Sequence, residues 1–169
     1  FKLLAKKHIN WEFIFTDLPE FDITHKKEVL AFFEENAFDY CINCAAYTAV
    51  DKAEEDAETS RLVNVNGPTN LAKACSDNGT TLIHISTDFV FDGSNNTPYN
   101  ETEPTQPLGV YGQTKLDGEL AVQKDVKQHF IIRTAWLYSQ FGNNFVKTML
   151  RLAEDRTELN VIVDQVGTP

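Results

Sequence analysis

The chain has no long apolar segment and few candidate metal ligands. No run among its 169 residues approaches the roughly 18 consecutive apolar residues of a membrane-spanning helix. It has three cysteines, of which Cys41 and Cys44 form a Cys-x-x-Cys pair with no second pair nearby, and its four histidines lack the spacing of metal ligands. We therefore expect no metal site, and we interpret the cysteines as buried, reduced thiols of a cytoplasmic protein.

The chain also lacks an excess of positive charge. Its 15 lysines and arginines are outnumbered by 25 aspartates and glutamates, which gives a net charge of −10. Nucleic acids and anionic membranes require a basic surface, so neither is an expected partner. The length and the hydrophobic content of 42% are those of one globular domain with a sizeable core.

Strand-like and helix-like patterns alternate along the chain. Strands are expected at 11–16, 40–44, 81–86, 130–134 and 160–163, and helices at 25–36, 59–78, 112–123 and 144–153. Thr24 and one of Asn143 and Asn144 are expected N-caps, Gly79 is expected to end the longest helix, and 92–107 is expected to be a loop. This order predicts an α/β fold with a Rossmann-like, doubly wound parallel sheet and helices on both faces.

Tyr111 and Lys115 are the most informative pair of the sequence. They are the ends of Tyr-Gly-Gln-Thr-Lys, so in a helix they lie one turn apart on the same face. A phenol normally titrates near pH 10, and a neighbouring ammonium favours the phenolate, so we expect a lowered pKa for Tyr111. Thr87 directly follows the strand expected at 81–86 and offers a hydroxyl that can hold a carbonyl or alcohol oxygen. These side chains suit proton transfer at such an oxygen while a hydride moves elsewhere.

Several motifs in a fixed order make the pair specific, because an isolated Tyr-x-x-x-Lys occurs by chance. With these motifs the chain resembles the extended, nucleotide-sugar branch of the short-chain dehydrogenase/reductase superfamily, and most closely the dTDP-4-dehydrorhamnose reductase family. The segments that carry the resemblance are 42–54, 86–93, 110–119, 133–138, 143–150 and 164–169.

The resemblance implies an oxidoreductase with NADPH or NADH as cofactor and a nucleotide sugar as substrate. It implies that Tyr111 donates the proton, that Lys115 lowers the pKa of Tyr111 and binds the nicotinamide ribose, and that Thr87 orients the ketone oxygen. Substrate contacts are implied for Thr87, Asp88 and Trp136. Cofactor contacts are implied for Asp17, Asp22, Ile23, Cys44, Ala45, Ala46, Thr48, Tyr111 and Lys115. The resemblance is compatible with a homodimer, and it leaves Mg²⁺ open without assigning a ligand.

Some of these residues have a plainer interpretation. Asp17 precedes Leu-Pro and is also a typical turn residue, whereas Asp22 is also a typical residue at the entry to a helix. Trp136 is equally a candidate core residue. Asn64, which precedes a Gly-Pro pair that weakens the helical pattern, has either a structural role or a role in a proton relay. The acidic run at 54–58 is interpreted as a solvated face.

One feature of a dinucleotide-binding fold is missing. No Gly-rich turn at a helix N-terminus, the usual receptor of the pyrophosphate, occurs in the sequence. The first seven residues resemble the end of the helix that follows such a turn, and the last two fall where the family continues into its substrate region. We therefore expect residues 1–169 to be a partial NAD(P)-binding Rossmann domain, with the C-terminal substrate-binding region mostly absent.

Three functions remain open from the sequence. The first is NAD(P)H-dependent reduction of dTDP-4-dehydro-L-rhamnose to dTDP-L-rhamnose. The second is another extended-family activity, such as epimerisation of a nucleotide sugar; a dehydratase is disfavoured because Phe89 follows Asp88 where dehydratases carry a second acid. The third is a non-enzymatic relative, like the regulatory beta subunit of methionine adenosyltransferase.

Overall fold

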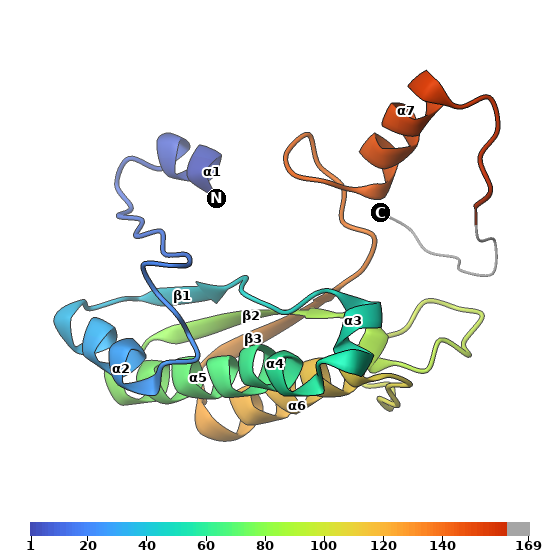
Figure 1. Ribbon diagram of the computed structural model, residues 1–169. Helices are drawn as coiled ribbons and strands as arrows, with labels where there is room; N and C mark the ends of the chain where they lie inside the picture. The colour runs from blue at the N-terminus through green and yellow to red at the C-terminus, as the bar shows by residue number, and fades with distance from the viewer. Residues whose placement is uncertain (162–169) are drawn as a thin grey trace.

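A computed structural model describes residues 1–161 and shows an α/β protein built on a three-stranded parallel sheet (Figure 1). The strands are β1 (Tyr40–Asn43), β2 (Thr81–Thr87) and β3 (His129–Thr134), and they lie in the order β1-β2-β3. Thr87 pairs in register with Thr134, and Asn43 pairs with His84. Parallel strands place their carboxyl ends at one edge of the sheet, where ligands of this fold class bind. The predicted α/β class with a parallel sheet is confirmed.

The helices that bury residues lie on one face of the sheet (Figure 1). They are α2 (Lys26–Glu35), α3 (Val50–Glu55), α4 (Ala57–Arg61), α5 (Gly67–Asn78) and α6 (Val110–Asp125), and a π-helical turn, η1 (Leu62–Asn66), joins α4 to α5. Helices α1 (Lys2–Lys7) and α7 (Phe145–Asp155) lie beyond the other face and contribute no buried residue. Among the described residues, the expected packing on both faces is therefore seen on one.

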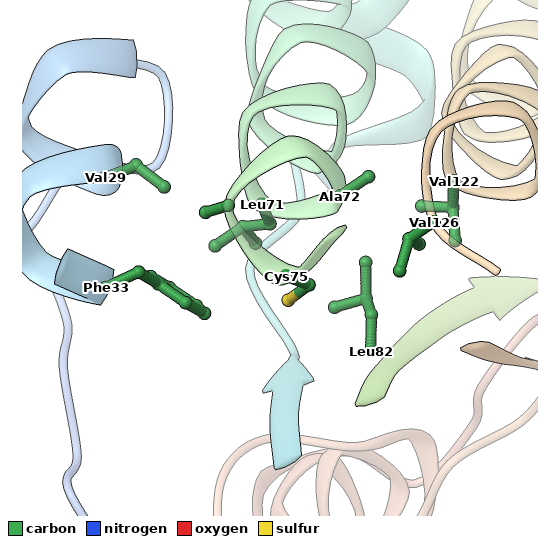
Figure 2. Close-up of a cluster of buried hydrophobic side chains, with 9 residues drawn as sticks. Val29, Phe33, Leu71, Ala72, Cys75, Leu82, Val122 and Val126 are labelled. Carbon is green, nitrogen blue, oxygen red and sulfur yellow. The ribbon is translucent and has the colours of Figure 1, made fainter. Parts of the chain in front are cut away.

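The core fills the space between the sheet and these helices. Figure 2 shows α2, α5, β2 and α6 contributing apolar side chains that converge there. Full burial of a valine, leucine or phenylalanine side chain stabilises the fold by about 1.5–3 kcal/mol. The core cluster consists of Val29, Phe33, Leu71, Ala72, Ala74, Cys75, Leu82, Val122 and Val126.

The expected strand at 11–16 is absent. Within the described chain no strand pairs with this segment, and an extended backbone forms a strand only when a neighbour satisfies its N–H and C=O groups. Its aromatic residues instead contact one another: the rings of Phe13 and Phe15 are stacked with centroids 5.9 Å apart, and those of Trp11 and Phe13 are tilted with centroids 6.0 Å apart. Half of the strand expected at 160–163 lies outside the described residues, and the two residues of it that are described form no strand.

Most expected helices are present with shifted boundaries. The helix predicted at 25–36 is α2, but its N-cap is His25 and Thr24 has no capping role. The helix predicted at 112–123 is α6, and the one predicted at 144–153 is α7, which Asn144 caps through a bond from the Lys147 N–H. The expected loop at 92–107 contains no helix or strand.

The long helix predicted at 59–78 is interrupted. It consists of α4, the π-helical turn and α5, and it ends as predicted at Gly79, whose φ is 70°. Pro68 has no N–H to donate to the carbonyl four residues earlier, which weakens the α-helical pattern here. The turn before it is wider than an α-helical turn, and the Gly67 N–H bonds to the carbonyl of Leu62, five residues earlier. Helix α3 was not predicted, and its last two residues, Glu54 and Glu55, were interpreted only as part of a solvated acidic face.

The three cysteines are free but differ in exposure. Cys75 is buried in the core, Cys41 is half-buried and Cys44 is exposed. The expectation that all three are buried is met by Cys75 and only in part by Cys41, and it was wrong for Cys44, because this residue follows the last residue of β1 and lies outside the sheet. None of the described helices has the length and apolar character to cross a membrane.

Candidate active site

The three predicted catalytic residues lie at the carboxyl edge of the sheet. Thr87 is the last residue of β2, and Tyr111 and Lys115 lie on the first two turns of α6, the helix that packs against β2. All three side chains are buried, with exposed fractions of 6% for Thr87, 8% for Tyr111 and 2% for Lys115. Helical spacing puts Tyr111 and Lys115 on the face that α6 turns toward the sheet, as the sequence predicted.

Thr87 is held by the short turn that follows it, η2 (Asp88–Val90). Its hydroxyl donates to the Asp88 carboxylate at 3.1 Å and accepts from the Phe89 N–H at 3.2 Å. These contacts fix the hydroxyl at the strand end. Asp88 itself is exposed, as expected for a residue that can also reach a substrate.

The pKa of Tyr111 moves in the direction opposite to the sequence prediction. Burial raises the pKa of this phenol, the neighbouring Thr87 hydroxyl opposes the increase, and the charge of Asp88 adds to it. The Phe89 ring contributes to the burial, with its centroid 5.5 Å from that of Tyr111 in an edge-on arrangement. Tyr111 is therefore protonated at neutral pH, which is the state required of a proton donor.

Lys115 lies deep between α6 and the sheet. Its ammonium donates to the Ile85 carbonyl at 2.8 Å. Burial lowers the pKa of Lys115 to about 8, and the negative charge of Glu119 acts against that decrease. The side chain is therefore mainly cationic at neutral pH, although burial leaves it closer to losing its proton than an exposed lysine.

The start of α6 is positioned by contacts that the sequence did not reveal. Gly109, the N-cap, has no side chain to bond the free N–H groups of the first turn, and the Glu54 carboxylate of α3 accepts from Val110 N–H at 2.8 Å instead. Gly112 lies so close to η2 that a Cβ there would overlap the Phe89 carbonyl oxygen. Glu54 therefore does more than solvate a surface, and its role depends on a contact 56 residues away that no local pattern indicates.

Asn64 connects the segment after β1 with α6. Its side chain is 1% exposed, and it both accepts from the Tyr47 N–H at 2.9 Å and donates to the Tyr47 carbonyl at 3.1 Å. The same amide donates to Thr114 at 3.2 Å, and the Thr114 hydroxyl donates to the Tyr111 carbonyl at 3.0 Å. A Cβ at Gly118 would overlap the Asn64 carbonyl oxygen, so α6 approaches the π-helical turn closely. All described contacts of the side chain are structural.

Replacing Asn64 by alanine is expected to destabilise the protein. The change removes the Asn64 hydrogen bonds and leaves buried partners unsatisfied, so the free energy of unfolding should fall by about 2–4 kcal/mol. Urea denaturation measures this. Asn100 is the control because its side chain makes three hydrogen bonds, one fewer than that of Asn64, but is exposed, and Asn100→Ala should cost about 1 kcal/mol or less. Equal losses in the two variants would contradict the role assigned to Asn64.

The predicted cofactor segment follows β1 at the same edge of the sheet. Cys44, Ala45 and Thr48 are exposed and Ala46 is half-buried, so small side chains border an accessible backbone. Asn43 fixes the start of the segment, because its side chain accepts from the Ala45 N–H at 3.0 Å and contacts His84 Nδ1 at 3.1 Å. The sequence analysis did not single out Asn43.

Asp17, Asp22 and Ile23 are not brought into this group by the contacts of the described chain. Asp17 is exposed directly after segment 11–16, and its carboxylate accepts from the Leu18 N–H at 2.9 Å. Asp22 accepts from the Thr24 N–H at 2.8 Å, which lowers the pKa of its carboxyl group. The Ile23 side chain packs closely on Gly67 at the start of α5. These contacts show turn and packing roles, and a cofactor contact remains a prediction for all three.

Trp136 follows β3 at the edge of the sheet that carries Thr87. It is exposed and not a core residue, and its ring lies edge-on to Phe145 with centroids 5.7 Å apart. Its φ of 48° lies in the left-handed region, which is uncommon for a residue other than glycine. Strained backbone of this kind clusters at ligand sites, so the predicted substrate contact of Trp136 stays open. No group of three or more His, Cys, Asp or Glu side chains in residues 1–161 has the geometry of a metal site.

The fold and the site define a Rossmann-like protein of the extended short-chain dehydrogenase/reductase class. The central strand of its parallel sheet, β2, ends at Thr87, and the adjoining helix α6 carries Tyr111 and Lys115 one turn apart. Within this class the chain belongs to the family described as the RmlD substrate binding domain, which it matches over residues 2–169.

Similar proteins support this assignment. The chain is 44% identical over 167 residues to the dTDP-4-dehydrorhamnose reductase of Sinorhizobium fredii, which covers 99% of the chain and 56% of that protein. It superposes with a TM-score of 0.95 on a solved dTDP-4-dehydrorhamnose reductase from Clostridium acetobutylicum, with 45% identity, covering 99% of the chain and 60% of the other. The TM-score is also 0.95, with 38% identity and the same coverage, for the enzyme from Bacillus anthracis solved with NADP. The chain thus spans about half the length of the curated relatives.

Proposed function

We propose that the full-length protein reduces dTDP-4-dehydro-L-rhamnose to dTDP-L-rhamnose with NADPH or NADH. The observation that carries this proposal is the arrangement of Thr87, Tyr111 and Lys115 at the carboxyl edge of the sheet. Two reductases of this name superpose with a TM-score of 0.95 and support it, as does the NADP bound to one of them. A nucleotide sugar is the corresponding partner. Residues 1–169 would form the part of the cofactor domain that holds the proton-transfer residues.

The residues present fit a nicotinamide cofactor. The exposed backbone at Cys44, Ala45 and Ala46 lies at the end of β1, with no large side chain to prevent close approach, and Thr48 adds a hydroxyl. Lys115 is cationic at neutral pH and suits a ribose hydroxyl, with Tyr111 beside it. When bound, the cofactor supplies the hydride.

The chain's own residues manage the proton and the developing charge. The buried Tyr111 phenol holds a proton at neutral pH and delivers it to the C4 oxygen of the sugar as that oxygen becomes an alkoxide. The Thr87 hydroxyl, whose proton is directed at Asp88 in this structure, turns that proton to the same oxygen, orients it and stabilises its charge. Asp88 and Trp136 border the position of the sugar. Lys115 stabilises the phenolate that Tyr111 becomes after the transfer.

Asp17 is proposed to limit the use of NADPH by repelling its 2′-phosphate. Replacing Asp17 by alanine should shift the kcat/KM ratio toward NADPH by about fivefold, the equivalent of the ~1 kcal/mol between unit charges about 4 Å apart in water. Steady-state kinetics with both cofactors measures the ratio. Glu20→Ala is the matched control, because Glu20 is an exposed acid in the same segment. An unchanged ratio in Asp17→Ala would leave Asp17 as a turn residue.

Activity assays with the full-length protein test the proposed function. NADPH consumption should depend on dTDP-4-dehydro-L-rhamnose and yield dTDP-L-rhamnose. An epimerase would interconvert nucleotide sugars without net consumption of NADPH, and a regulatory subunit would catalyse neither reaction. Either of those outcomes would contradict the proposal.

A further inference from the structure

The ion pair between Glu119 and Arg133 lies beside the proposed site and has no part in the chemistry described so far. Glu119 is 1% exposed and lies on α6 one turn after Lys115. Arg133 of β3 donates to both carboxylate oxygens of Glu119: Nε lies 3.0 Å from Oε1 and 3.2 Å from Oε2, and Nη2 lies 2.6 Å from Oε2. A carboxylate this deeply buried remains ionised only when it is paired in this way.

Arg133 is itself fixed from the side of the loop. Its guanidinium carbon lies 5.0 Å from the centre of the Phe91 ring, as in a cation–π contact. The Phe91 ring is stacked on Tyr99 at 4.2 Å with an interplanar angle of 8°. The Tyr99 hydroxyl donates to Asp92 at 3.2 Å. The pair is therefore a rigid element rather than a mobile surface contact.

Among the groups around Lys115, Glu119 is the one whose charge counteracts the effect of burial on the pKa of Lys115. His84 of β2 is uncharged, because burial lowers its pKa to about 3. Tyr111 is protonated, as its raised pKa requires. Arg133 is turned to Glu119, and Asp88 is exposed beside Tyr111. Glu119 lies on the same buried face of α6 as Lys115 and acts to raise the pKa of Lys115.

We propose that Glu119, held in place by Arg133, is a positioning residue that keeps Lys115 in its charged form during the reaction. Its consequence for turnover rests on the proposed function, because Lys115 acts there as a cation. Glu119 contacts neither substrate nor cofactor in this scheme and acts only through Lys115. The short bidentate contact with Arg133 holds the carboxylate in one orientation on the face of α6 that also carries Lys115.

Glu119→Gln in the full-length protein should move the alkaline limb of the kcat/KM pH profile toward acid. Lys115 loses its proton before Tyr111 on the alkaline side, because its pKa is about 8 and that of Tyr111 is raised above its ordinary value. Without the negative charge the pKa of Lys115 falls further, so the cation is lost at lower pH. We expect a shift of about one pH unit, at the low end for a neighbouring charge because Arg133 partly neutralises Glu119.

The control is Asp117→Asn, which removes an acid from the same helix. Asp117 pairs with Arg61 at 3.0 Å, and Arg61 is exposed. This variant should leave the limb in place. If Glu119→Gln lowers the stability but leaves the alkaline limb at the wild-type pH, the Glu119–Arg133 ion pair has only a structural role and the inference is overturned.

A second variant covers the case in which Glu119→Gln does not fold because Arg133 is left unpaired. The double variant Glu119→Gln, Arg133→Met leaves no unpaired charge, and its limb should also move toward acid. An unmoved limb in the folded double variant overturns the inference.

An NMR titration separates this inference from the proposed function. Protein labelled at the lysine side chains, with Lys115→Arg used for assignment, reports the Lys115 pKa without any turnover. A lower Lys115 pKa in Glu119→Gln supports the inference even if the wild type reduces no nucleotide sugar, in which case only the proposed function fails. Equal Lys115 titration in both proteins overturns the inference.

Discussion

Tyr111→Phe is expected to reduce kcat by about 10²–10⁴-fold, the contribution typical of general acid catalysis. The substitution removes the hydroxyl that carries the proton and keeps the ring, so the edge-on packing against Phe89 is retained. The affinity for NADPH should stay near that of the wild type, because the ring and Lys115 remain. Steady-state turnover and a calorimetric titration of NADPH measure the two quantities.

Tyr138→Phe provides the control for the loss of a phenol. Tyr138 is exposed beyond the end of β3, and turnover should not change in this variant. If Tyr111→Phe keeps most of the wild-type turnover, another group supplies the proton and the assignment of Tyr111 is wrong. A large loss of NADPH affinity would instead show that Tyr111 serves in binding.

Thr87→Val is expected to lower kcat by about 10²–10³-fold, the cost of removing one donor to a developing oxyanion. Valine has nearly the shape of threonine and fits the buried end of β2, but it has no hydroxyl to orient the ketone oxygen. The same change removes the acceptor for the Phe89 N–H. Unfolding in urea, measured beside the kinetics, shows how much of the effect is structural.

Thr87→Ser separates these contributions because it keeps the hydroxyl. Serine accepts the same bond from Phe89 and offers the same donor, so turnover should remain close to that of the wild type. Similar turnover losses in the serine and valine variants would contradict the role of the hydroxyl. They would point to the packing of the strand end, which the serine variant alters by losing a methyl group and the valine variant by gaining one.

The sequence was sufficient for features that depend on neighbouring residues or strong periodicity. The spacing of Tyr111 and Lys115 placed both on one face of α6, and the run ending in Thr87 was correctly predicted as a buried strand. Gly79 ended its helix in the left-handed conformation because glycine adopts it without strain. Such signals are local, so they survive without knowledge of the tertiary structure.

Several of the failures involve distant partners. Segment 11–16 has the apolar pattern of a strand, but strand formation depends on a neighbour that no local pattern specifies. The direction of the Tyr111 pKa depends on burial by Phe89 and on where Lys115 points, and the helical spacing indicates neither. Glu54 was dismissed as part of a charged surface because its bond to Val110 joins two helices. The same holds for the pairing of Glu119 with Arg133.

The most direct test of the central claim is to follow the hydride. The full-length protein is incubated with dTDP-4-dehydro-L-rhamnose and NADPH that carries deuterium at both nicotinamide C4 positions, and the product sugar is analysed by mass spectrometry and NMR. Net reduction of the ketone predicts dTDP-L-rhamnose with a single deuterium, at C4 of the sugar, formed in step with NADPH consumption. Unlabelled sugar, or interconversion of nucleotide sugars without consumption of NADPH, would contradict the account.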